Sequence, residues 1–313
     1  MSTIRYVMAG LLVGGVFTVG CVGADEAPAD VDELAGDAAE APLRRTIAPI
    51  GANGMSPSDF WDPVNRASLR ELGLDAILDE GGALVPTPLL DTAGGRSVLD
   101  YTVRCALSEG ATVSLPGGRT LYGSFGLAPE WAERGLTTSE QRWVSACLFQ
   151  HLNGANEHVE ILLEGHHSSL ECPREEEPFA GFNVRDATMF GNAFLDRPIV
   201  AYACIDPELA GVLSGLSLSC PLDLNLLVLE RLCGHTPLLC GVSFVGLCDL
   251  ACTEDANGDQ TCGSFALAAV LGPLLGPLVA PTYSLVAPTY SETIRTELHD
   301  RDILPLYGSC GLL

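Results

Sequence analysis

The chain begins MSTIRYVMAGLLVGGVFTVGC, residues 1–21, and this stretch bears on the whole fold because it sets the redox compartment in which the cysteines react. One cation, Arg5, precedes an uncharged apolar run that ends at Val19, and small residues then lead to Cys21. This order is typical of a secretory signal peptide. The run has about a dozen residues, whereas a membrane-spanning helix needs roughly 20. We therefore expect residues 1–20 to be a signal peptide and the mature chain to be exported.

The end of this stretch, Thr18-Val19-Gly20-Cys21, resembles the lipobox of bacterial lipoproteins. In that family the cysteine thiol is acylated and becomes the first residue of the mature protein. Leu is more common than Thr at the position of Thr18, so cleavage with release, giving a secreted or periplasmic protein, stays open as an alternative. An Asp after the cysteine tends to hold family members at the inner membrane, and Val22 stands there instead. The resemblance thus implies lipidation of Cys21 and anchoring in the outer membrane.

The composition after the signal peptide divides the chain into three further parts. Residues 21–52 comprise the lipidated cysteine and an acidic, Ala- and Pro-rich stretch with few large apolar residues, which predicts a disordered linker. Residues 53–205 are expected to form an α+β domain. Residues 206–313 are expected to form a cysteine-rich C-terminal subdomain. The predicted fold class is therefore α+β, a disulfide-stapled secreted domain with a cysteine-rich C-terminal part.

Twelve cysteines are present, and an exported protein keeps its disulfides because its compartment is oxidising. If Cys21 carries lipid, the remaining eleven are an odd number, so one should be free or paired with another chain. Six lie between residues 220 and 262, which indicates a locally stapled module whose pairing the sequence leaves open. A zinc site is the alternative, but no C-x-x-C pair occurs and the oxidising compartment favours disulfides.

Charge and composition exclude several classes of function. The net charge is -24, and it becomes about -25 once residues 1–20 are removed, so a phosphate backbone would be repelled and no nucleic-acid partner is expected. All sixteen basic residues are Arg, which excludes Schiff-base lysines, Ser-Lys dyads and the P-loop lysine. H-E-x-x-H and G-x-S-x-G are also missing from the sequence. We therefore expect no cofactor.

Local patterns predict helices and strands in an α+β order. Asp62-Pro63 predicts an N-cap and the first position of a helix that ends at Gly81-Gly82. A second helix is expected over residues 97–107, with Cys105 pointing inward. Further expected elements are a hairpin over 111–125, a helix after a capping box formed by Thr137 and Glu140, a strand over 158–164, and an apolar helix over 221–232 with Arg231 on its apolar stripe.

Five short segments resemble an uncharacterised family of secreted, cysteine-rich proteins from myxobacteria-like organisms. They are Trp143–Leu148, His158–Ile161, Met189–Phe194, Tyr202–Cys204 and Tyr290–Ile294. The resemblance implies a shared fold and a shared disulfide plan over approximately residues 97–300. It implies no activity and assigns no catalytic residue.

The polar stretch around the expected strand over 158–164 holds the candidate site residues His158, Glu160, His166 and His167. Imidazole and carboxylate groups suit a zinc ion or an acid/base pair, and loops at strand ends often carry function. The structural alternative, which we favour, is the solvated face of an antiparallel strand followed by a polar turn. No metal site is therefore assigned.

Together these features predict a cell-envelope lipoprotein that acts as a non-catalytic binding or structural module. Its partners would be the membrane, through the lipid on Cys21, and a protein or glycan that the sequence does not identify. The alternative is an extracytoplasmic hydrolase, metal-dependent or not, that uses the region His158 to His167. The first function rests on the linker and the cysteines, and the second rests only on the clustering of suitable side chains.

Overall fold

The computed structural model describes residues 50–155, 158–170, 179–215, 224–234, 240–255, 260–263 and 289–307, all within one compact unit. The predicted signal peptide, the lipidation site Cys21 and the linker up to residue 49 lie outside the described residues. Residues 50–52, which the sequence analysis placed in the linker, instead belong to a strand. The described chain contains helices, sheets and disulfides, so the predicted α+β class with disulfides is confirmed.

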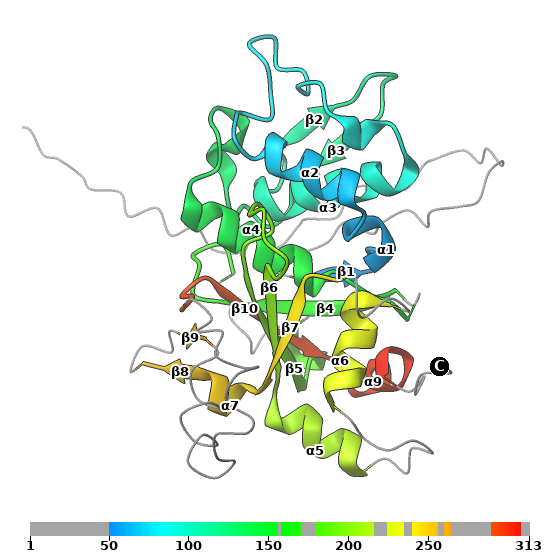
Figure 1. Ribbon diagram of the computed structural model, residues 1–313, viewed down its shortest axis with the longest axis vertical. Coiled ribbons are helices and arrows are strands. Elements are labelled where there is room, and N and C mark those ends of the chain that lie inside the picture. Colours follow the sequence, from blue (N-terminus) through cyan, green and yellow to red (C-terminus); the bar gives the residue numbers. More distant parts are fainter. Residues whose placement is uncertain are drawn as a thin grey trace, which may run out of the picture. The chain divides into compact units, whose positions relative to one another are not determined.

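The elements follow one another along the chain as Figure 1 labels them. The α-helices are α1 (Pro57–Phe60), α2 (Pro63–Leu72), α3 (Ala93–Ala106), α4 (Thr138–Gln150), α5 (Pro207–Gly215), α6 (Leu224–Cys233), α7 (Cys248–Ala251) and α9 (Asp300–Tyr307). The 3-10 helices are η1 (Pro88–Leu90), η2 (Pro129–Ala132) and η3 (Phe179–Gly181). The strands are β1 (Ile50–Asn53), β2 (Thr112–Ser114), β3 (Thr120–Tyr122), β4 (Val159–Glu164), β5 (Val184–Gly191), β6 (Ala201–Ile205), β7 (Val242–Leu247), β8 (Cys252–Glu254), β9 (Gln260–Cys262) and β10 (Thr293–Leu298).

A six-stranded sheet with the order β1-β4-β10-β5-β6-β7 forms the centre of the fold. Neighbouring strands are antiparallel, except that β6 and β7 are parallel. Although β10 lies near the end of the chain, it pairs with β4 on one side and with β5 on the other. The subdomain predicted from residue 206 therefore contributes two strands, β7 and β10, to a sheet whose other strands precede residue 206.

Apolar side chains cover both faces of this sheet. On one face α4 packs against β5 and β10, and α3 packs against α4, as Figure 1 shows. On the other face Phe190 of β5 packs with Tyr290 and with Cys262 of the β8–β9 hairpin. A second group on that face of β4 joins Leu162 to Ile50, Phe179 and Phe182. Leu162 is thus buried, although the sequence analysis placed its strand face toward solvent.

The expected helix start at Asp62-Pro63 is confirmed, because the Asp62 carboxylate accepts hydrogen bonds from the backbone N–H groups of residues 64 and 65. The expected end at Gly81-Gly82 is wrong, since α2 ends at Leu72. Beyond that residue the chain finds tertiary partners instead of helical ones. The Ile77 N–H donates to the Trp131 carbonyl, for example, and this hydrogen bond is incompatible with a continued helix.

Four disulfides join described cysteines, and no described cysteine is free. The pairs are Cys105–Cys147, Cys204–Cys248, Cys233–Cys240 and Cys252–Cys262. Cys105 points inward as predicted and links α3 to α4. Two of the bridges, Cys233–Cys240 and Cys252–Cys262, lie within the predicted module of residues 220–262, whereas Cys248 of that module pairs with Cys204 on β6. Cys172, Cys220 and Cys310, and with them the expected odd cysteine, lie outside the described residues.

Within the described ranges, no helix has both the length and the apolar character that crossing a membrane requires.

The capping box at the start of α4 offers a test of local stability. The Thr137 hydroxyl accepts from the Glu140 N–H at 3.3 Å, and the Glu140 carboxylate accepts from the Thr137 N–H at 2.7 Å, as the sequence predicted. Replacing a capping Thr by Ala typically costs about 1 kcal/mol, so we expect Thr137→Ala to lower the free energy of unfolding by about that amount in urea denaturation. The neighbouring exposed Thr138 makes no capping bond, and Thr138→Ala is the matched control. Equal losses in the two variants would contradict the assigned cap.

Candidate functional site

The structure separates the candidate site residues that the sequence places close together. His158 precedes β4, whereas His166 and His167 follow it, and a six-residue strand spans roughly 20 Å. Glu160 is exposed on the strand, and its carboxylate lies 4.0 Å from the Arg301 guanidinium. The histidines therefore lie at opposite ends of the strand and do not converge on one site.

The local contacts of these histidines are structural. The His158 ring lies against Gly54 so closely that a Cβ on that glycine would be 2.1 Å from the ring nitrogen Nδ1. His167 Nδ1 accepts a hydrogen bond from the Ser169 backbone N–H at 3.2 Å. The ring of His167 also meets Trp143 edge-on, with 5.3 Å between the ring centroids. These contacts order the loops at both ends of β4.

Among the described residues, only Cys105, Cys147 and His151 form a trio of potential metal ligands, with all three ligand atoms within 4.8 Å of one another. The two sulfur atoms are bonded to each other. Because the thiolate is the form of cysteine that ligates metals, the bridge removes two of the three ligands. The trio is therefore a buried staple between α3 and α4 with a histidine packed beside it.

Among the described histidines, His151 is the buried one, and no sequence pattern indicated its burial. Its Nδ1–H donates to the Cys147 carbonyl at 2.8 Å, and its ring lies between those of Tyr101 and Phe125. Burial is the main cause that lowers the pKa of His151 to about 4; the positive charges of Arg104 and Arg231 act in the same direction, and the hydrogen bond to the Cys147 carbonyl opposes them. The imidazole is therefore neutral at pH 7.

A second buried polar group lies between the sheet and two helices of the C-terminal half. The Arg231 guanidinium of α6 pairs with the Asp186 carboxylate of β5, and neither side chain has any exposed surface. The Tyr307 hydroxyl of α9 accepts from Arg231 at 2.7 Å and donates to Asp186. The Thr296 hydroxyl of β10 donates to the same carboxylate at 2.9 Å. Four elements from three separate regions of the sequence, β5, α6 and the neighbouring β10 and α9, thus share one charge pair.

Electrostatics keep this group ionised at the arginine and neutral at the tyrosine. Burial, the largest single cause, would lower the pKa of Arg231, but the charge interactions and hydrogen bonds with Asp186 and Tyr307 together outweigh it, and the net shift is upward. Burial raises the pKa of Tyr307 well above its usual value. Arg231 Nε is buried and has no hydrogen-bond partner. A charge held in this way, without access to solvent, stabilises structure and is unsuited to proton transfer with a substrate.

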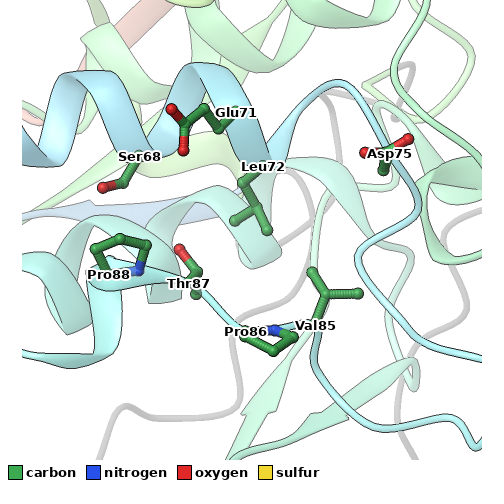
Figure 2. Close-up of a pocket in the computed structure, with 8 residues that line it drawn as sticks. All are labelled: Ser68, Glu71, Leu72, Asp75, Val85, Pro86, Thr87 and Pro88. Atoms are coloured by element: carbon green, nitrogen blue, oxygen red, sulfur yellow. The ribbon is translucent and has the colours of Figure 1, made fainter.

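A surface pocket of about 260 Å³ lies among the described residues, and Figure 2 shows the residues that line it. One wall is α2 with the turn after it, and the other is the segment that leads into η1. The lining residues are Ser68, Glu71, Leu72, Asp75, Val85, Pro86, Thr87 and Pro88. The sequence analysis missed this pocket. Helical spacing places the first four residues on one face, but no pattern indicates that residues 85–88 pack opposite them.

Comparison with known proteins identifies no relative: no family model matches the sequence, and neither a curated protein nor a solved structure shows significant similarity to it.

The charge pair in the core predicts a strongly non-additive response to mutation. Arg231→Met leaves the Asp186 carboxylate buried without its cation, which typically costs about 3–5 kcal/mol of unfolding free energy. We expect Arg231→Met with Asp186→Leu to be more stable than Arg231→Met alone, because the double variant buries no unpaired charge. Urea denaturation of the wild type, both single variants and the double variant completes the cycle. Additive losses would contradict the described pairing.

His151 predicts a pH dependence of stability. Its folded pKa of about 4 lies below the usual value of 6.5, so the unfolded chain binds the proton more readily. The contribution of the neutral His151 to the free energy of unfolding is therefore fully present above pH 6.5. As the pH falls toward 4 this contribution is lost, and the loss amounts to about 3 kcal/mol. His151→Gln should flatten the fall in unfolding free energy between these pH values, whereas His158→Gln, at an exposed histidine, should not. Identical pH profiles for the wild type and His151→Gln would refute this account.

Proposed function

We propose that this protein is an exported module of the bacterial cell envelope, anchored by lipid at Cys21, that binds a partner and does not catalyse a reaction. The observation that carries the proposal is the set of four disulfides among the described residues. Disulfides persist in oxidising compartments and are rare in the cytosol. They therefore support export, which is also what the leader and its lipobox-like ending predict.

The proposed place is the outer membrane, because Val22 and not Asp follows the cysteine. Residues 22–49, with their excess of acidic side chains, would act as a self-repelling linker between the lipid and the folded unit. The partner bound by that unit would be a protein or a glycan. Secretion or release into the periplasm is the alternative if Cys21 is not acylated.

The geometry favours binding over hydrolysis. General acid–base catalysis needs its groups within hydrogen-bond reach of one reacting atom, about 3 Å. His158 and the pair His166 and His167 lie at opposite ends of β4, and His151 is buried and donates to a carbonyl. The pocket between α2 and residues 85–88, in contrast, presents polar side chains to solvent. A hydrolase built on the region His158 to His167 is therefore the less favoured function.

Acylation of Cys21 can be tested directly in the full-length protein expressed with its own leader. We expect metabolic labelling with a radioactive fatty acid and partition into the detergent phase of a Triton X-114 extract, because an acyl chain adds apolar surface to an otherwise acidic chain. Cys21→Ser should abolish both. Thr18→Leu, which restores the residue common in the lipoprotein family, should retain both and is the matched control. Wild-type protein that carries no label and stays in the aqueous phase would refute the anchor.

A further inference from the structure

Ser68 is the residue that marks the pocket of Figure 2 as a binding site. Its side chain lines the pocket, and the residue is 4 % exposed. Its hydroxyl makes no hydrogen bond to any residue in the described part of the chain. Ser68 Oγ is not one of the fully buried atoms that lack a partner, so solvent reaches it and its hydrogen-bonding capacity is open to a bound group. The hydroxyl is therefore available to an occupant of the pocket.

Two carboxylates give the pocket a negative charge. Glu71 lies three residues after Ser68 and shares a face of α2 with it, whereas Asp75 lies in the turn after the helix; all three line the pocket. Within the described residues, neither carboxylate lies within 4.0 Å of a cationic group. Arg70, their neighbour on α2, is engaged elsewhere by Asp196 at 3.2 Å. The negative charge of the pocket is thus not neutralised from within the fold.

The remaining lining is apolar, apart from one hydroxyl. Leu72 is buried on the α2 side, and Val85, Pro86 and Pro88 face it from the opposite wall. Thr87 Oγ1 accepts a hydrogen bond from the Leu89 N–H at 3.3 Å and has a lone pair left for a further donor. The pocket therefore combines an apolar wall with four side chains that can accept hydrogen bonds, two of them charged.

We propose that this pocket binds a primary ammonium group carried on an alkyl stem. An ammonium has three N–H donors and no acceptor, which matches a set of hydroxyl and carboxylate oxygens. The methylene stem would lie along the apolar wall, as lysine stems do on protein surfaces. A volume of about 260 Å³ holds several times the roughly 30 Å³ of one water molecule but is small for a drug-sized ligand. The inference deepens the proposed binding function by naming the chemical class of the ligand.

The probe for this site is n-pentylamine, compared with n-pentanol as its uncharged analogue. We expect the amine to bind the full-length protein in detergent micelles, with chemical shift changes centred on residues 68–75 and 85–88, and the alcohol to bind more weakly. Rising salt should weaken amine binding because the carboxylates are exposed. Nα-acetyl-lysine N-methylamide is a second probe. Tighter binding of that compound than of pentylamine would identify a lysine of a partner protein as the source of the ammonium, and equal binding a free amine.

Variants in the pocket make the assignment residue-specific. Glu71→Gln and Asp75→Asn should each weaken pentylamine binding about two- to fivefold, as expected for an exposed ion pair. Ser68→Ala should also weaken pentylamine binding, because it removes the hydroxyl and leaves the apolar wall intact. Glu109→Gln removes an exposed carboxylate elsewhere and is the matched control for net charge. The melting temperature of each variant verifies that the fold is intact.

Three outcomes would overturn the proposal: no binding of pentylamine, equal affinity for pentylamine and pentanol, or the same loss in Glu109→Gln as in the pocket variants. None of these outcomes bears on the lipid anchor, which is tested separately by acylation of Cys21. Conversely, amine binding that persists in a protein without fatty-acid label would overturn the anchor alone. The failure of one proposal is therefore distinguishable from the failure of the other.

Discussion

Arg231 lies within the fold with no exposed surface, and the carboxylate of Asp186 balances its charge. Desolvating such a pair costs several kcal/mol per ion, which their mutual attraction offsets only when the remaining hydrogen bonds are made. Tyr307 and Thr296 make those bonds from α9 and β10. The charge pair is therefore satisfied only when four elements, β5, α6, β10 and α9, are all in place. This requirement positions α6 and α9 relative to β5 and β10.

The disulfides stabilise the fold by a different route, through their effect on the unfolded chain. Cys105–Cys147 joins the two helices that stack over the sheet, and Cys204–Cys248 joins β6 to the helix that follows β7. Each closes a loop of more than forty residues, and closing a loop of that size restricts the unfolded chain more than a short bridge does. The Arg231–Asp186 pair and its hydrogen bonds determine which elements pack together. The disulfides, in contrast, reduce the conformational entropy that the chain loses when it folds.

Sequence patterns predicted the local features and missed the distant ones. The N-cap at Asp62 and the capping box at Thr137 depend on residues a few positions apart, so the sequence revealed them. The central position of β10 depends on pairing with β4 and β5, more than a hundred residues earlier, and no local pattern records it. The candidate histidines are close in sequence, but β4, a strand that the sequence predicted, holds His158 apart from His166 and His167. Arg231 on an apolar stripe was the one visible sign of the buried charge pair.

The polar groups of the described chain lie in two kinds of surroundings. His151 and the Asp186–Arg231 pair are buried, and their hydrogen bonds go to other parts of the fold. At the pocket, in contrast, the carboxylates of Glu71 and Asp75 are exposed and the hydroxyl of Ser68 has no partner among the described residues. The hydroxyl and carboxylate oxygens of this pocket accept hydrogen bonds, whereas the N–H groups of an organic ammonium only donate them. This complementarity is the physical basis of the ligand proposed for the pocket.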